Sequence, residues 1–297
     1  DLARDVEEKV GTVEAVRFFK IASGKSVPTD HHLESWIARL KDVAKTKDEK
    51  RRIVLAFAKE FPFTDDVDHG KVRTWVRGML AKGDARGTVA KRVSFVRTYW
   101  QHLKDEGLIP PEDRTFMGVM PEGSNKTKAQ REEEREPFTP VEVVKLLTAA
   151  GERKDHDLAV LIWLAMWTGC RIEELCSLKV TEVGADRIHV RDAKTKAGNR
   201  LVPLHPRVRP IVAKLKERSK DGYLLSGLTF NKYGDRSNAV GKRFGRLKAD
   251  LGFGASHVFH SIRKTVVTLL ENAGVPEGVA ADIVGHDKKT ITYGLYS

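Results

Sequence analysis

Residues 168–178 read TGCRIEELCSL and place an arginine and a glutamate, Arg171 and Glu174, three positions apart. Side chains at that spacing share one face of a helix, so the segment predicts a helical ion pair. Taken alone, such a pair is most often a surface contact. A second pair with the same spacing, His260 and Arg263, lies in the later segment HVFHSIRKT. Each of the two predicted helices therefore carries a pair of charged or ionisable side chains one turn apart.

The length and net charge of the chain indicate its number of domains and the class of partner that it binds. Its 297 residues exceed the usual size of one domain, which predicts two domains of unequal length. The formal net charge of +12 favours a polyanionic partner, nucleic acid before membrane, although a merely basic soluble protein has the same composition. No apolar run approaches the roughly 20 residues of a membrane span, and the opening DLARDVEEKV lacks the pattern of a signal peptide. We therefore expect a cytoplasmic protein without membrane contact.

Only two cysteines occur, Cys170 and Cys176, and both fall in what reads as one helix. Their separation within that helix corresponds to a rise of about 9 Å, which is too long for a disulfide. The sequence therefore predicts two thiols that do not pair with each other.

The first half of the chain reads as helical, and its clearest element is an amphipathic helix within residues 88–107. Apolar residues recur there at spacings of four and three, with Thr88 as the N-cap and Gly107 as the end. The stripe consists of Val89, Val93, Val96, Trp100 and Leu103. Basic residues face away from this stripe and recur in the segment KVRTWVRGML. Such a face is more often only solvated, but its repetition predicts contact with DNA through Lys71, Arg73, Arg77, Lys91, Arg92 and Arg97.

A polar segment separates the two halves. Residues 121–136 carry Pro and Gly early and mixed charge afterwards, which is typical of a linker. A strong helix start follows, with Thr139 as N-cap, Pro140 at the first helical position and Glu142 closing a capping box. The predicted divisions are an N-terminal extension at 1–24 that can form a further helix, a helical DNA-binding domain at 25–120, the linker at 121–136 and a second domain at 137–297.

The second domain opens with apolar helices and then changes period. Residues 186–194 and 199–204 alternate in polarity or run β-branched, and KAGN between them supplies turn residues, so this region predicts a β-hairpin. Helices resume afterwards, including an amphipathic segment at 260–275 with Gly274 as its stop. The expected fold class is mainly α with a small β-sheet, that is, α+β.

The order of these motifs resembles the tyrosine recombinase (phage integrase) family, whose catalytic domain carries Arg, Lys, His-x-x-Arg, His or Trp, and Tyr in that sequence. TGCRIEELCSL looks like the first arginine box, FHSIRKT like the second, and IVGHDKKTITYGLYS, residues 283–297, like the closing box. The first half, with GTVAKRVSFVRTYWQHLKDEGLIP, is similar to the helical core-binding domain. The resemblance implies a SAM-like core-binding domain followed by a catalytic domain with the fold of the DNA breaking-rejoining enzymes.

The resemblance also implies roles for individual residues. The catalytic positions are Arg171, Lys194, His260, Arg263, His286 and Tyr296, with Glu174 in support. The lysine belongs in the hairpin turn, where Lys194 is preferred because it stands in an Ala-Lys-Thr triplet, and Lys196 is the alternative. Tyr296 fits the family's Thr-Thr-x-x-Tyr-like ending, with Thr292 at the first threonine position, and Tyr293 is the alternative nucleophile.

Such a set suits exchange of phosphodiester bonds without a metal ion. Two guanidiniums and two imidazoles can neutralise the charge that builds on the nonbridging oxygens. The tyrosine would form a 3′-phosphotyrosyl bond, the lysine would protonate the departing 5′ oxygen, and His260 is a candidate acceptor of the phenolic proton. Two other patterns, His257 with His260 and the segment TDDVDH, lack the ligand set of a known metal site, so we expect no metal and no other cofactor.

The resemblance thus predicts a site-specific DNA recombinase that cuts and rejoins double-stranded DNA through a Holliday junction, for integration or excision of a phage or mobile element. By the same resemblance, four protomers assemble on two duplexes, accessory DNA-bending proteins are further partners, and the setting is the nucleoid of a bacterium or its phage. Two alternatives stay open: a type IB topoisomerase-like enzyme that relaxes DNA, and a non-catalytic DNA-binding relative. The integrase-like first half and the short chain count against the topoisomerase.

Overall fold

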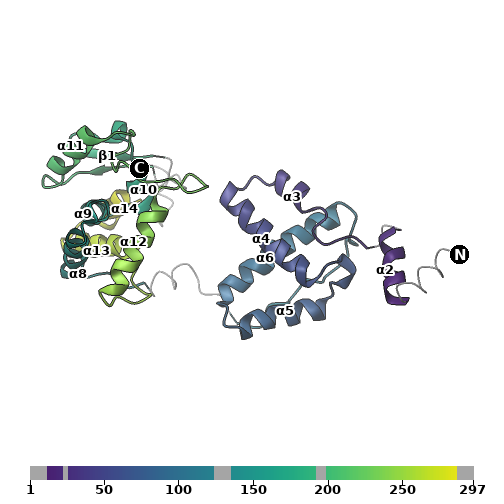
Figure 1. Ribbon diagram of the computed structural model, residues 1–297. Helices are drawn as coiled ribbons and strands as arrows, with labels where there is room; N and C mark the ends of the chain where they lie inside the picture. The colour runs from purple at the N-terminus through teal and green to yellow at the C-terminus, as the bar shows by residue number, and fades with distance from the viewer. Residues whose placement is uncertain (1–11, 23–25, 124–134, 192–198, 286–297) are drawn as a thin grey trace. The chain divides into compact units, whose positions relative to one another are not determined.

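The computed structural model describes residues 12–22, 26–123, 135–191 and 199–285. The chain divides into two compact units, Asp1–Thr127 and Lys128–Ser297 (Figure 1). The boundary between the units falls within residues 121–136, the segment that the sequence predicts to be a linker. Each unit has a hydrophobic core of its own.

The first unit is helical in its described part. Its elements are α2 (Thr12–Ala22), α3 (Leu33–Arg39), α4 (Ala44–Glu60), the 3-10 turn η1 (Thr64–Asp66), α5 (His69–Ala81) and α6 (Arg86–Asp105). The long helices α4 and α6 pack against each other, and α3 and α5 also pack on α6. Asp68 begins α5 by accepting a 2.8 Å hydrogen bond from the backbone N–H of Lys71, as an N-cap does.

The amphipathic stripe predicted for α6 is confirmed. All five of its apolar side chains are buried in the core of this unit. The predicted end is also confirmed, because Gly107 follows the helix with a φ of 73°. The predicted start is wrong: Ala85 is the N-cap, and its carbonyl already accepts hydrogen bonds from the backbone of Thr88 and Val89. Helical bonding therefore begins a turn earlier, and Thr88 lies inside the helix.

The second unit combines helices with a two-stranded antiparallel sheet, which confirms the predicted fold class. Its elements are α8 (Pro140–Glu152), α9 (His156–Thr168), α10 (Ile172–Cys176), the 3-10 turn η2 (Val180–Glu182), β1 (Arg187–Val190), β2 (Arg200–Pro203), α11 (Arg209–Arg218), α12 (Ser237–Asp250), α13 (Phe259–Asn272) and α14 (Glu277–Val284). Within the described ranges, no helix has the length and apolar character that crossing a membrane requires.

The start of α8 follows the predicted capping box. The Thr139 hydroxyl accepts from the backbone N–H of Glu142 at 3.2 Å, and the Glu142 carboxylate accepts from the backbone N–H of Thr139 at 2.8 Å. Both bonds satisfy donors that a helix start leaves without partners. Phe138, just before the cap, is buried among the aromatic rings of Phe244 and Phe253, so α8 enters the core at a fixed place.

The predicted hairpin is confirmed by the pairing of β1 with β2. The register places Val190 opposite Arg200 and Ile188 opposite Val202. All four of these side chains are more than nine-tenths buried, so the inward face of the hairpin carries one charged residue, Arg200, among three aliphatic ones. The turn that holds Lys194 and Lys196 lies outside the described residues.

The prediction that Cys170 and Cys176 share one helix is wrong. Helix α9 ends at Thr168, Gly169 follows with a φ of 62°, and α10 begins only at Ile172. A side chain at Gly169 would be strained by that φ and would approach the methyl groups of Val266 and Val284 to 3.2 Å. The glycine thus lets α9 stop where α13 and α14 pack closely against it. Both cysteines are buried and free.

Candidate active site

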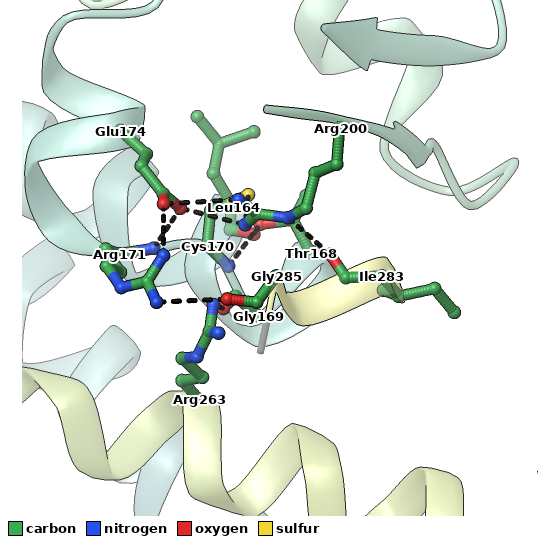
Figure 2. Close-up of polar contacts among 10 residues, drawn as sticks. All are labelled: Leu164, Thr168, Gly169, Cys170, Arg171, Glu174, Arg200, Arg263, Ile283 and Gly285. Atoms are coloured by element: carbon green, nitrogen blue, oxygen red, sulfur yellow. Dashed lines mark hydrogen bonds and ion pairs between the residues drawn. The ribbon is translucent and has the colours of Figure 1, made fainter. Parts of the chain in front are cut away.

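Arg171 lies in the short connection between α9 and α10 and is held by Glu174 (Figure 2). The Glu174 carboxylate accepts a 2.8 Å bond from the backbone N–H of Arg171 and a 2.6 Å bond from its Nη1. The same carboxylate therefore caps α10 and orients the arginine side chain. Arg171 also donates from Nη2 to the carbonyl of Gly285 at 3.1 Å, while 39% of its side chain stays exposed.

A second arginine, Arg200, reaches the same carboxylate from β2. Its Nη2 and Nη1 lie 2.9 Å and 3.2 Å from the two oxygens of Glu174. Its Nε donates to the carbonyl of Ile283 at 2.7 Å, and Nη2 also lies 3.6 Å from the sulfur of Cys170. Only 5% of the Arg200 side chain is exposed. Arg200 thus joins β2, α10 and the end of α14.

Glu174 is ionised because of its arginine partners. Burial by itself would raise the pKa of its carboxyl, since the charged form loses solvation. Hydrogen bonds and charge from Arg200, and hydrogen bonds from Arg171, outweigh that effect and lower the pKa from 4.5 to about 2. The carboxylate is therefore a permanent negative group at neutral pH, shared by two guanidiniums.

Arg263 approaches from α13 and is almost fully enclosed, with 2% of its surface exposed. Its Nη1 donates to the carbonyl of Gly169 at 2.9 Å, so the left-handed glycine at the end of α9 also orients this arginine. Burial first, and then the charges of Arg171 and Arg200, lower the pKa of Arg263 to about 10. Two donors of Arg263, Nε and Nη2, are buried and make no hydrogen bond within the described part of the chain.

This arrangement fits an anionic group. Buried donors are nearly always hydrogen-bonded in proteins, so two donors of a cation that lack a partner among the described residues can take an anionic acceptor. Arg171, partly exposed beside Arg263, adds further donors in the planar form that suits phosphate oxygens (Figure 2). His260 lies half-buried in the first turn of α13, where the helix dipole also favours negative charge. The site can therefore neutralise charge on a phosphate.

The structure brings together some of the residues predicted for the site. Arg171, Glu174 and Arg263 lie in one cluster, and His260 lies one helical turn from Arg263 on α13. The other predicted members, Lys194, Lys196, His286, Tyr293 and Tyr296, lie outside the described residues.

The basic residues predicted to contact DNA differ in their surroundings. Arg73, Arg77 and Arg97 are exposed. Lys71 is exposed but lies 3.4 Å from Asp68, and Lys91 lies 2.6 Å from Glu49. The expectation of a fully exposed basic face is wrong for Arg92, because this residue is half-buried and pairs with Asp84 in the turn before α6.

Side chains of the two sequence patterns considered as metal sites, His257 with His260 and the segment TDDVDH, make contacts within the protein. The ring of His257 packs against Phe138 at 4.8 Å between centroids. In the segment TDDVDH, Asp65 pairs with Lys20, and Asp68 caps α5. Among the residues that the structure describes, no group of three or more His, Cys, Asp or Glu side chains could hold a metal ion.

Arg200 is the member of the cluster that the sequence motifs missed. A signal was present, because side chains two apart on a strand face the same way and Val202 is an obvious core residue. An arginine on the inward face needs a buried acid as partner, since an isolated buried charge is costly. Glu174 meets that need.

Comparison with known proteins finds a matching family model and similar sequences. The family model described as Phage integrase family matches residues 136–297, which is more than half of the chain. A tyrosine recombinase XerC-like protein of Caldanaerobacter subterraneus subsp. tengcongensis is 24% identical over 265 residues. That match covers 76% of this chain and 66% of the relative, so the chain spans a little under two thirds of that protein.

Solved structures share the fold. A lambda integrase dimer bound to a COC′ core site superposes with a TM-score of 0.70 at 19% identity, covering 98% of this chain and 84% of that one. A lambda integrase tetramer bound to a Holliday junction superposes with a TM-score of 0.67 at 18% identity, covering 89% and 77%.

Proposed function

The chain belongs to the phage integrase family of tyrosine recombinases, and from this premise we propose that it cuts and rejoins DNA through a covalent 3′-phosphotyrosine intermediate. Membership of the family makes it an enzyme of site-specific DNA recombination. The observation that carries the mechanistic proposal is the cluster of Arg171, Glu174, Arg200 and Arg263. Among the described residues, two donors of the buried Arg263 have no hydrogen-bond partner, and a DNA phosphate would supply an acceptor for them.

In the proposed reaction, Arg171 and Arg263 bind the nonbridging oxygens of the scissile phosphate. Attack on phosphorus builds negative charge on these oxygens, and preorganised guanidiniums stabilise that charge without reorganising. Glu174 fixes Arg171 in the required orientation, and His260 and His286 supply further donors. These roles rest on the cluster for the arginines and on the family motifs for the histidines.

The covalent steps balance without an external energy source. The phenolic oxygen of Tyr296 attacks phosphorus, and its proton passes to His260. The bond from phosphorus to the 5′ oxygen breaks, and Lys194 protonates that oxygen as it leaves. The phosphotyrosyl bond keeps the energy of the broken link, so a free 5′ hydroxyl can later reverse the step and rejoin the strand.

For partners, we propose double-stranded DNA and assembly of four protomers on two duplexes. One structurally similar protein is a lambda integrase tetramer bound to a Holliday junction. The net charge of +12 fits a polyanion, and exposed arginines such as Arg73 and Arg97 in the first unit are candidates for phosphate contacts. From membership of the family, we also propose that accessory DNA-bending proteins bind as partners and that the reaction serves integration or excision.

One assay separates this function from its two alternatives. A single supercoiled DNA that carries a recognised site is tested for strand exchange, for relaxation and for binding, all in EDTA because the proposed charge neutralisation uses protein donors. Recombination predicts exchange together with a covalent protein–DNA adduct. Relaxation without exchange would indicate a topoisomerase-like activity, and binding without an adduct would indicate a non-catalytic relative.

The arginine roles have a matched test within the same assay. Arg171→Ala and Arg263→Ala should bind the DNA but lose adduct formation by at least about 100-fold, the usual effect of removing a donor to a developing oxyanion. Arg218→Ala, which alters an exposed arginine at the end of α11, should keep the wild-type rate. Wild-type rates in both cluster variants would remove the basis of the proposed mechanism.

A further inference from the structure

Arg200 contacts residues that support the site, and its own side chain is too buried to contact a bound ligand. Its side chain is 5% exposed, and its guanidinium is occupied by Glu174 on one side and by the carbonyl of Ile283 on the other. Arg171, in contrast, is 39% exposed. The division suggests that Arg171 faces the ligand, while Arg200 holds what Arg171 rests on.

Both groups that orient the Arg171 side chain depend on Arg200. One is the Glu174 carboxylate, whose two oxygens receive Nη1 and Nη2 of Arg200. The other is the carbonyl of Gly285, which lies two residues beyond Ile283, the residue whose carbonyl accepts from Arg200 Nε at 2.7 Å. Arg200 and Arg171 thus bond to carbonyls at the same end of α14, where a helix leaves its last carbonyls without internal partners (Figure 2).

The charge balance points the same way. Glu174 alone could neutralise Arg171 one to one and weaken its pull on a phosphate. With Arg200 as a second partner, the carboxylate is shared, and the cluster that includes Arg263 keeps more positive than negative groups. A neutral side chain at position 200 would remove the hydrogen bond to the end of α14. It would also leave Arg171 as the partner that neutralises the Glu174 carboxylate.

We propose that Arg200 is a positioning residue of the reaction, which acts through Arg171 by fixing the Glu174 carboxylate and the carboxyl end of α14. This inference rests on the proposed function. Arg200 does not touch the DNA; it sets the direction in which Arg171 meets the scissile phosphate. Strand β2, which follows the hairpin turn, is thereby tied to the arginine site.

The first test is a double-mutant cycle on adduct formation with a nicked suicide substrate. Arg200→Met should slow adduct formation about 100-fold, as small misplacements of catalytic groups do, while the DNA affinity changes less than about threefold. Arg200→Lys keeps the positive charge but not the planar pair of donors, so its rate of adduct formation should lie between those of the wild type and Arg200→Met. In an Arg171→Lys background, which retains the charge at position 171, adding Arg200→Met should slow the reaction by less than about threefold.

Two results would overturn the inference in that cycle. Independent, multiplying effects of the two changes would show that Arg200 does not act through Arg171. Recovery of the Arg200→Met rate on a 5′-bridging phosphorothiolate, whose thiolate leaves without a proton, would show that Arg200 serves the lysine of the hairpin turn instead. We expect no recovery.

A second measurement does not need activity. Hydrogen–deuterium exchange of α14 (Glu277–Val284) should speed up in Arg200→Met, because its end loses an anchor, while α8 stays unchanged. Arg187→Met, an exposed arginine on the partner strand, should change neither helix. Unchanged exchange in α14, or faster exchange with a wild-type adduct rate, would overturn the role of Arg200. Absence of any adduct from the wild-type protein would instead contradict the proposed function.

Discussion

Replacing Glu174 by glutamine should destabilise the second unit by about 3 kcal/mol at pH 7. The carboxylate is 9% exposed and lies between Arg171 and the still more buried Arg200. A pKa lowered from 4.5 to about 2 corresponds to roughly 3 kcal/mol, and breaking a buried ion pair typically costs about 3–5 kcal/mol because one charge stays unpaired. The free energy from the lowered pKa and the usual cost of a broken buried ion pair therefore agree in magnitude.

The pH dependence has a definite sign. The folded-state pKa of Glu174 lies below its ordinary value, so the ionised carboxylate stabilises the fold above about pH 4.5, and this stabilisation is lost as pH falls toward 2. Since glutamine resembles the protonated acid, the difference between wild type and Glu174→Gln should shrink by more than half, to roughly 1 kcal/mol, at pH 3.

The assay must separate the two units, because a chain with two cores need not unfold in one step. Hydrogen exchange read by mass spectrometry in increasing urea gives the free energy of unfolding from peptides of α9 and α13. Glu217→Gln, an exposed carboxylate on α11, is the matched control and should stay within about 0.5 kcal/mol of wild type. A loss below 1 kcal/mol in Glu174→Gln, or a loss independent of pH, would refute the buried, shared carboxylate.

Other measurements test other parts of the structure. Affinity for nonspecific duplex should fall steeply with salt, and Arg73→Gln with Arg77→Gln should reduce the log–log slope by up to about 0.9 for each DNA phosphate that these arginines neutralise; an unchanged slope would remove these residues from the interface. Burial raises the pKa of both cysteines, so neither thiol should react with a disulfide reagent at pH 7 until urea unfolds the protein, and fast labelling of Cys170 in the native state would contradict its burial. A 5′-bridging phosphorothiolate should restore cleavage by Lys194→Ala, and restoration in Lys196→Ala instead would move the general acid.

The features that the sequence predicts well are local. The capping box at Thr139 and Glu142 joins residues three apart, and the apolar stripe of α6 repeats with the helical period, so both can be read from spacing alone. The approach of Glu174 to Arg171 is local in the same sense. Their meeting with Arg263 could be expected only from the order of family motifs.

The features that the sequence did not predict depend on distant contacts. Arg200 finds Glu174 and Ile283 only when β2, α10 and α14 pack together, and no spacing rule links those elements. Helix α9 stops at Gly169, which adopts a left-handed φ, and the valines of α13 and α14 leave no room for a side chain there, although the segment TGCRIEELCSL reads as one helix. Arg92 is an exception, because its partner Asp84 lies only eight residues earlier, in the turn before α6, and the helical spacing of α6 alone does not indicate this pair.

The central claim is a covalent bond between DNA and one tyrosine of the closing box. The wild-type protein is incubated with a nicked suicide substrate, the trapped adduct is digested, and the DNA-linked peptide is identified by mass spectrometry. We predict DNA on Tyr296, loss of the adduct in Tyr296→Phe, and retention of most of it in Tyr293→Phe. DNA on Tyr293 would move the nucleophile, and no adduct from intact protein that binds the substrate would contradict the phosphotyrosine mechanism.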